Sequence, residues 1–555
     1  MNIRDSIRGI LSRSPRTAIQ EVAKSISGAA ALSLVLVLPW TASAAEFDTG
    51  GDWNIRWDNT LRYSSELRTS PRARALIADP NSDDGDRNFS PGIVSNRFDW
   101  ISQLDISKGV YGLDISAAAW YDSVYWENTA NKSSATFNPY SVSSGRFTRD
   151  VRALHGGDAE IQNAFVYGAA TVGGRPLSFR LGRHTLLWGE SLFFSDNGIA
   201  GAQAPVDYIK VHANPISYAR DVYMPVAQAS ASLQLSNDLA LDAYFQFEWR
   251  ENREEGAGAY LNSEDFVYAG GERFIYEPGR YFYKENFLYP HDKGQFGVAL
   301  RWTSGEADFG LYALRFNAKS PVVYFRPGID LDTNAVIDPS RVDPSSGKIG
   351  TYRSVYPEGI EVYGLSASGY LGESSIAGEI SARRNMPLAS EEFLVQLPGQ
   401  TADASGHPLY AVGDTLHAQI SSTTTFGRDA FWDGATLNAE IAATNRLSVT
   451  RNRAALDPAA DAFSSMFRIT FEPSYFAVLP GLDMTPVLGL GYGLTGNSST
   501  NHDRKAHTGD FELGINLTYR SEWSGSLMYT YFIGAPERQP LADRDFLRFS
   551  IQRTF

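Results

Sequence analysis

Apolar and polar side chains alternate one by one over many short segments of this chain. Between positions 241 and 250 the odd-numbered residues run apolar from Leu241 to Trp249, and the even-numbered ones run mostly polar from Asp242 to Arg250. The same repeat occurs in segments 53–63, 296–303 and 511–520. A period of two residues is typical of a β-strand whose two faces meet different surroundings. Aromatic residues stand at the ends of many apolar faces, as in the girdles of a membrane barrel.

The connections between these segments alternate in length. We predict about 18 strands, in a range of about 16 to 20, and every second connection is a tight turn such as Lys108-Gly109 or Gly305-Glu306. The others are long and polar, near 66–91, 123–157, 185–221, 252–292, 319–356 and 386–410. Turns at one end and loops at the other are the arrangement of a transmembrane antiparallel β-barrel.

Two soluble all-β folds also show alternating strands. A β-sandwich rarely needs so many strands, and a β-propeller would show a repeat of about 40 residues, which the chain lacks. The sequence therefore favours a single membrane barrel over either alternative.

Composition excludes several classes of protein. The chain has no cysteine, which excludes disulfides, cysteine-ligated metal sites, a thiol nucleophile and a lipidated N-terminal cysteine. Its formal net charge is −14, whereas a nucleic-acid-binding protein needs a basic patch. We therefore expect no nucleic-acid partner.

The N-terminal 44 residues have the pattern of a secretory signal peptide. A basic start, with Arg4 and Arg8 among its charges, precedes an apolar run over 26–38 and the small residues Ala42-Ser43-Ala44. The run is shorter than the roughly 20 residues that a membrane-spanning helix requires. We predict a cleaved signal over 1–44 and a barrel over 45–555, located in the outer membrane of a Gram-negative cell and in contact with its lipid.

The last strand carries an assembly signal. Leu547, Phe549 and Ile551 alternate with polar residues, and the chain ends at Phe555. A terminal aromatic on an alternating strand resembles the signal by which the barrel-assembly machinery recognises outer-membrane proteins, and Arg553 departs from that pattern. We expect this machinery to be a partner through Phe555.

A barrel of this size encloses an aqueous lumen unless something fills it. The polar faces of the predicted strands carry charges of both signs, which we expect to hydrate the lumen. The predicted lining residues are Arg56, Asp58, Arg62, Asp99, Asp105, Asp114, Arg180, Asp242, Glu248, Arg250, Arg301, Glu379, Arg383, Glu440, Arg446, Glu512, Arg520 and Arg548.

One long connection differs from the others. Residues 186–207 are apolar, rich in glycine and weakly charged, a composition poorly suited to water. One interpretation is a loop folded into the lumen that narrows the pore and offers apolar contacts to a ligand. The alternative, a loop that packs down to seal the outer rim, has equal weight. The candidate residues are Trp188, Glu190, Leu192, Phe193, Phe194 and Asp207.

Several motifs resemble those of the proteobacterial domain of unknown function 1302 family. They occupy 57–63, 83–89, 181–184 with 188–194, and 204–207, and the resemblance covers essentially the whole predicted mature chain. His184 stands where the family more often has glutamine. The resemblance implies an outer-membrane barrel that functions in envelope transport, beside exporters of the resistance-nodulation-division class or with the catabolism of hydrophobic compounds such as steroids, terpenes or aromatics. It implies no defined substrate or site.

Enzyme signatures are missing. The sequence has no Gly-x-Ser-x-Gly elbow and no His-Glu-x-x-His pair, and its eight histidines show no ligand spacing. We predict no catalytic residue, metal or cofactor. The predicted function is a porin-like channel for uptake or export of a small hydrophobic or aromatic compound. The alternatives are a barrel that docks a periplasmic exporter without conducting, and an outer-membrane hydrolase.

Overall fold

The structure is a computed structural model that describes residues 45–48, 51–214 and 222–555. The predicted signal peptide, 1–44, lies outside the described residues. Among the described residues, no helix is long and apolar enough to cross a membrane.

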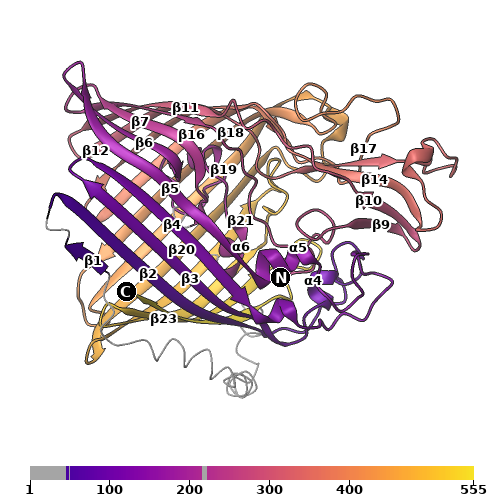
Figure 1. The fold of residues 1–555 in the computed structure, drawn as a ribbon, viewed down its shortest axis with the longest axis horizontal. Helices are drawn as coiled ribbons and strands as arrows, with labels where there is room; N and C mark the ends of the chain where they lie inside the picture. The colour runs from indigo at the N-terminus through magenta and orange to yellow at the C-terminus, as the bar shows by residue number, and fades with distance from the viewer. Residues whose placement is uncertain (1–44, 49–50, 215–221) are drawn as a thin grey trace.

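In the described part of the chain, eighteen antiparallel strands form a closed barrel, as the sequence predicts (Figure 1). Each pairs with the next along the chain, and β2 pairs with β24 from Thr60↔Thr554 to Arg68↔Phe546 to close the barrel. The strands are β2 (Trp53–Arg68), β3 (Gly92–Lys108), β4 (Tyr111–Asp122), β5 (Gly157–Val172), β6 (Arg175–His184), β7 (Val226–Gln234), β8 (Leu239–Gln246), β11 (Phe296–Ser304), β12 (Ala307–Phe316), β15 (Ile360–Leu371), β16 (Ser374–Pro387), β18 (Val412–Phe426), β19 (Gly434–Arg451), β20 (Phe463–Leu479), β21 (Leu482–Thr495), β22 (Gly509–Tyr519), β23 (Trp523–Ile533) and β24 (Phe546–Thr554).

Two further pairings with β2 reinforce this closure. The short strand β1 (Ala45–Asp48) pairs with the first part of β2. In addition, the backbones of Phe555 and Asn59 exchange two hydrogen bonds of 2.8 and 2.9 Å. The C-terminal residue is therefore fixed in the wall of the barrel.

The two ends of the barrel differ. One end carries tight turns, where Gly109 and Gly305 adopt positive φ values of 59° and 63°, a conformation that costs glycine little. The other end carries long loops, on the right of Figure 1. By the usual arrangement of outer-membrane barrels, the turn end faces the periplasm and the loop end faces the outside.

The loops contain further secondary structure. A second sheet has the strand order β17, β13, β14, β10 and β9. Its strands are β9 (Arg273–Glu277), β10 (Arg280–Lys284), β13 (Val322–Pro327), β14 (Lys348–Val355) and β17 (Leu394–Val395). The helical elements are α4 (Asp84–Arg87), η2 (Ser123–Trp126), α5 (Arg149–Val151), η3 (Arg152–Gly156), η4 (Ile199–Ala202), α6 (Tyr208–Ala213), η5 (Pro339–Arg341) and η6 (Arg453–Ala455).

The apolar cores lie largely in the loop layer and inside the barrel. Phe89, Tyr125, Phe147 and Tyr260 pack together with Phe546 under the first loops. A second cluster fills the loop sheet, around Phe282, Phe325 and Tyr352. The wall itself has the reverse polarity of a soluble protein, since outward residues such as Leu300 and Trp302 are exposed while inward charges such as Asp242 and Glu440 are buried. Such a surface suits a hydrocarbon exterior.

Candidate functional site

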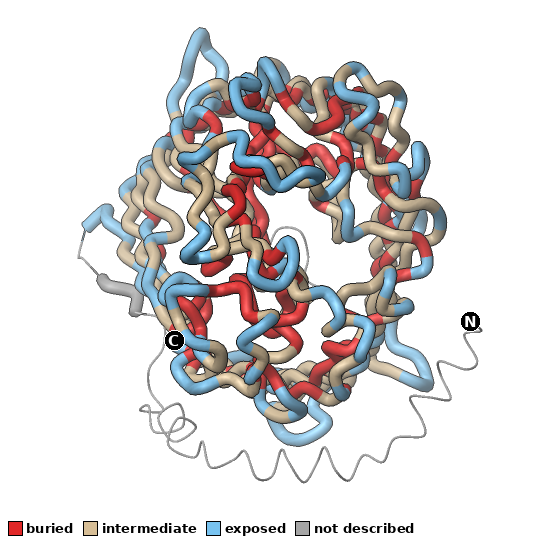
Figure 2. Tube along the Cα trace, turned by 90° about the vertical axis from the view of Figure 1, so that its right-hand side faces the viewer, coloured by how far each residue is buried: buried red, intermediate tan, exposed pale blue. Residues whose placement is uncertain are grey.

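Residues 185–214, between β6 and β7, fold into the barrel; we call them the inserted segment. They include η4 and α6, and they hydrogen-bond to the inner faces of β16, β18 and β19, which are remote from β6 in the strand order. Viewed from the loop end, part of the chain crosses the interior of the barrel, and many residues there are buried (Figure 2). The prediction of a loop folded into the lumen is confirmed.

A carboxylate of the wall holds the tip of the inserted segment. Glu440 on β19 accepts three successive backbone N–H groups, from Leu192 at 3.1 Å, Phe193 at 2.6 Å and Phe194 at 2.8 Å. Three donors converging on one carboxylate form charge-assisted hydrogen bonds, which are about twice as strong as neutral ones. Glu440 therefore anchors the tip through three backbone N–H groups of the inserted segment.

Two charges on β16 hold the flanks of the same tip. Glu379 accepts the N–H groups of Glu190 at 2.8 Å and Ile199 at 2.9 Å. Arg383 donates to the carbonyl oxygens of Asn197 at 2.7 Å and Gly198 at 2.9 Å. A Cβ on Gly198 would collide with the Glu379 carboxylate, so the close approach requires glycine there.

Further polar contacts fix the segment more deeply. The Asn197 amide donates to Gln419 at 3.1 Å, and its oxygen lies 3.0 Å from Nδ1 of His417. Lys319, in the loop after β12, donates to the carbonyl oxygen of Ala202 at 3.3 Å. Burial lowers the pKa of Lys319 to about 7, and Arg383 adds to this effect. The segment is thus held along its length rather than at one point.

The predicted constriction residues fall into different environments. Trp188 is buried and packs against Tyr244 and Tyr312 of the wall, with ring centroids 5.1 and 6.1 Å away. Phe193 and Phe194 instead line a cavity, where the Arg504 guanidinium lies 5.5 Å from the centre of the Phe194 ring.

The other three predicted constriction residues make contacts that hold the inserted segment in place. Glu190 and Leu192 use their backbone N–H groups as described above. Asp207 caps α6 by accepting from the N–H of Lys210, and it pairs with Arg253 at 3.0 Å.

The cavity beside the two phenylalanines has a volume of about 280 Å³. It lies between the inserted segment and β20, β21 and β22, with Tyr208, Phe532 and the arginines 468 and 504 in its lining. We call it the aromatic cavity.

Two larger cavities lie within the barrel and among its loops, and one of them shares Val222 with the aromatic cavity. A vestibule of about 1470 Å³ opens among the loops, and a polar cavity of about 610 Å³ lies within the barrel. Trp120, Leu154, Glu160 and Arg253 line both, so the two cavities meet at these residues. At this junction Glu160 accepts from Arg253 and, at 3.1 Å, from Arg250.

Residues 25–555 match the family described as protein of unknown function DUF1302. The chain belongs to this family. No curated protein matches the DUF1302 chain. The closed barrel, its lipid-facing apolar band and this membership identify an outer-membrane β-barrel protein.

Several solved structures match the DUF1302 protein over most of its length. Acinetobacter baumannii OccAB3 is 9% identical with a TM-score of 0.43, and the match covers 90% of this chain and 99% of that one. Pseudomonas aeruginosa OccK8 (OprE) is 10% identical with a TM-score of 0.41, covering 90% and 98%. A BenF-like porin from Pseudomonas fluorescens Pf-5 is 9% identical with a TM-score of 0.41, covering 90% and 98%.

Many predicted lining charges of the DUF1302 barrel lie in opposite-charge pairs. Arg56 lies 2.8 Å from Asp58, Arg62 3.3 Å from Asp99, and Arg468 3.9 Å from Glu512. Arg301 pairs with Asp242. A wall of paired charges attracts water without a strong net field.

The remaining predicted lining residues differ in position. Glu248 and Arg250 follow the end of β8 rather than lying within it, and Glu248 pairs with Arg183 at 3.1 Å. The Arg180 guanidinium lies 5.7 Å from the centre of the Phe165 ring. Arg520 lies in the turn after β22, with a φ of 51°.

Some residues of the site were not predicted. The alternation in β4 and β5 places Trp120 and Glu160 on inward faces, so the strand pattern contained a signal for both. Arg253 and Arg504 come from irregular loops, where no pattern gives their direction. The hydroxyl of Ser191, nearest to a hydrolase motif, donates to Glu379 at 3.2 Å and accepts from Gln419 at 2.6 Å, which is a structural role.

His155 beside the polar cavity makes the stability of the loop layer depend on pH. Burial lowers its pKa to about 4, partly offset by Glu255, and its Nε2 accepts the N–H of Gly256 at 3.0 Å. Because the folded pKa lies below the unfolded value of about 6.5, the contribution is full above pH 6.5 and is lost as the pH falls toward 4. We expect a loss of about 3 kcal/mol across this window, measured by chemical unfolding in micelles. His155→Gln should flatten the profile; an unchanged profile would contradict this assignment.

Proposed function

We propose that this protein is an outer-membrane channel for uptake or export of a small hydrophobic or aromatic organic compound, alongside an envelope exporter. One observation carries the proposal: the outer vestibule and the polar cavity meet at Trp120, Glu160 and Arg253. Contiguous water-accessible space within a barrel wall is what diffusion of a solute requires.

The inserted segment supplies the preference for aromatic compounds. It presents Phe193 and Phe194 to the aromatic cavity, whose lining includes the buried wall residues Arg468 and Phe532. Aromatic rings bind one another through burial and edge or offset stacking, each favourable pair adding about 0.5–1.5 kcal/mol. A cavity of about 280 Å³ is at the lower limit for small-ligand sites, which suits a compound with one or two rings.

The transport mechanism is diffusion with a weak binding step. Paired charges such as Arg62 and Asp99 hydrate the wall. The anchored tip keeps the two phenylalanines at a fixed position because Glu440 holds their backbone. Weak contacts then slow an aromatic solute without trapping it, as passage through a pore requires.

Conductance in a planar bilayer tests the proposal. The purified protein should give discrete open steps, and benzyl alcohol should reduce the current more than glycerol does. The double variant Phe193→Ala/Phe194→Ala should weaken this block about tenfold, which corresponds to about 1.4 kcal/mol of binding.

Phe431→Ala is the matched control. This phenylalanine lies in the turn between β18 and β19, is 74% exposed and lines neither cavity, so its loss should leave the block unchanged. A bilayer without open steps would contradict the channel and favour a barrel that docks other envelope components. Equal block of the double variant and the wild type would exclude the aromatic cavity as the binding site.

A further inference from the structure

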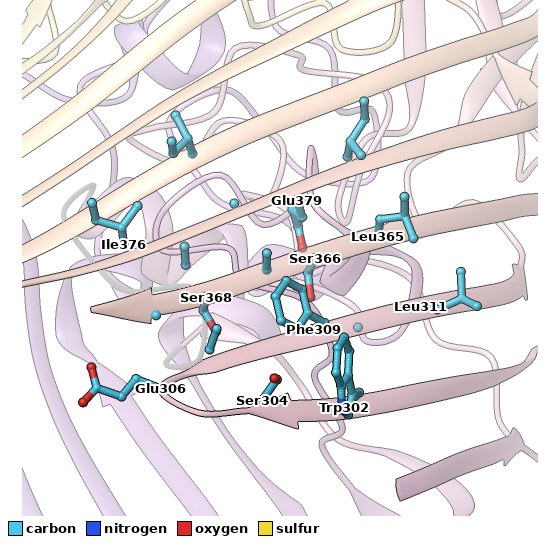
Figure 3. A pocket seen from close by; sticks show the side chains of 18 of the residues that line it. Trp302, Ser304, Glu306, Phe309, Leu311, Leu365, Ser366, Ser368, Ile376 and Glu379 are labelled. Atoms are coloured by element: carbon cyan, nitrogen blue, oxygen red, sulfur yellow. The ribbon is translucent and has the colours of Figure 1, made fainter. Parts of the chain in front are cut away.

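The outer surface of the barrel carries a groove that the pore does not use. It runs over β11, β12, β15 and β16 and has a volume of about 910 Å³, within the range of about 300–1,000 Å³ typical of ligand sites. Figure 3 shows Trp302, Phe309, Leu311, Leu365 and Ile376 along it. We call it the lipid-facing groove.

The strand register creates the groove by aligning small residues. Phe309 pairs with Ala367, Ala367 with Gly378, and Gly378 with Ile420. Two small residues, an alanine and a glycine, therefore lie between two large side chains. This leaves a depression in an otherwise bulky surface. A Cβ on Gly378 would lie 3.3 Å from the carbonyl oxygen of Gln419 and 3.8 Å from the Ile420 side chain, so this position suits glycine, which keeps the depression.

The groove opens outward and not into the lumen. The ladder between β12 and β15 is unbroken from Asp308↔Ser368 to Phe316↔Ile360, and that between β15 and β16 from Glu361↔Arg384 to Leu371↔Ser374. An unbroken ladder leaves no passage for a solute through the wall. Whatever occupies the groove comes from the membrane.

The length of the lipid-facing groove matches the thickness of one leaflet of the membrane. From Leu365 to Leu371 the strand extends about 20 Å at roughly 3.4 Å per residue, and a strand tilt of about 40° reduces this to about 15 Å along the membrane normal. Half of a hydrocarbon core of about 30 Å has the same depth. The groove ends near the turn at Gly305-Glu306, which places it in the periplasmic leaflet.

The charge at this end selects a head group. Glu306 lines the groove, and the adjacent turn carries the exposed Glu373. Carboxylates at the membrane surface attract an ammonium group and repel an anionic head group. We propose that the groove binds an acyl chain of one phosphatidylethanolamine molecule of the periplasmic leaflet, whose ammonium group meets Glu306.

Native mass spectrometry of the detergent-solubilised full-length protein tests this proposal. Phosphatidylethanolamine and phosphatidylglycerol with the same acyl chains are added in parallel, and wild type should retain one molecule of the first in preference. Ala367→Phe fills the groove and should reduce retention about tenfold. Glu306→Gln should keep chain binding but reduce the preference for phosphatidylethanolamine roughly two- to fivefold.

Ala170→Phe is the matched control, because Ala170 is also exposed on the lipid face, on β5, outside the groove. It should retain the lipid like wild type, and heat-dependent migration in detergent gels verifies that each variant is folded. Equal retention by Ala367→Phe and Ala170→Phe would overturn the proposal. A dimer that only Ala367→Phe converts to a monomer would also overturn it, since a second copy would then occupy the groove. Neither result depends on channel activity, so failure here is separate from failure of the proposed function.

Discussion

Replacing Glu379 and Glu440 together by alanine should release the inserted segment and increase single-channel conductance. Each carboxylate accepts two or three hydrogen bonds from the segment, and both side chains are buried. Hydrogen bonds to charged groups contribute about 1.5–3 kcal/mol each. Losing the equivalent of two such bonds therefore shifts the equilibrium between the anchored and the released segment by at least about 3 kcal/mol. This corresponds to a factor of roughly 100 in the population of the released state.

Two measurements detect the release. Planar-bilayer recordings should show larger and noisier open steps, and a protease added to the folded protein should cleave within 185–214. The control is Glu306→Ala/Glu373→Ala, which removes the same two charges from exposed turns. If the Glu379/Glu440 variant kept both the conductance and the protease resistance of wild type, these carboxylates would not be the anchors.

The barrel could be predicted because its pattern is local. A strand with lipid on one face and water on the other must alternate, so segments such as 239–246 are recognisable without any knowledge of their neighbours. The pattern fails where alternation outlasts the strand. Residues 247–250 continue it, yet β8 ends at Gln246 and Glu248 turns to accept from the N–H of Ala227 at 2.8 Å.

The inserted segment was predictable in outline only. Its apolar, glycine-rich composition indicates burial, but its partners come from distant strands. Glu190 and Glu379 are 189 positions apart, and Leu192 and Glu440 are 248 apart. Trp188 illustrates the same limit: a large aromatic in such a loop suits a ligand site, and only the position of Tyr244 and Tyr312 shows that it packs against the wall.

Replacing Arg68 by methionine should destabilise the closure of the barrel at its loop end. The Arg68 side chain is fully buried at the end of β2, with Nη2 2.6 Å from Asp86 and 3.4 Å from Asp543. It also donates to the carbonyl oxygens of Ser70 at 2.8 Å and Phe89 at 3.0 Å. Removing one partner from a buried ionic cluster costs about 3–5 kcal/mol, because the carboxylates left behind have lost both water and counter-ion. Unfolding in urea, followed by tryptophan fluorescence in micelles, measures the loss.

The pH dependence of this loss separates uncompensated charge from simple loss of packing. Burial and Asp86 already raise the pKa of Asp543 to about 6, so this group reduces stability as the pH rises from about 3.8 to 6. Without the positive charge of Arg68, the pKa of Asp543 rises further, and its ionisation reduces stability over a range that extends to higher pH. The variant should therefore lose more stability at pH 8 than at pH 5. Arg428→Met, at an arginine whose side chain is 80% exposed, should change stability by less than about 0.5 kcal/mol at either pH. A loss that is equal at both pH values would mean that Arg68 acts through its hydrocarbon stem and backbone contacts, and that the two carboxylates do not depend on its charge.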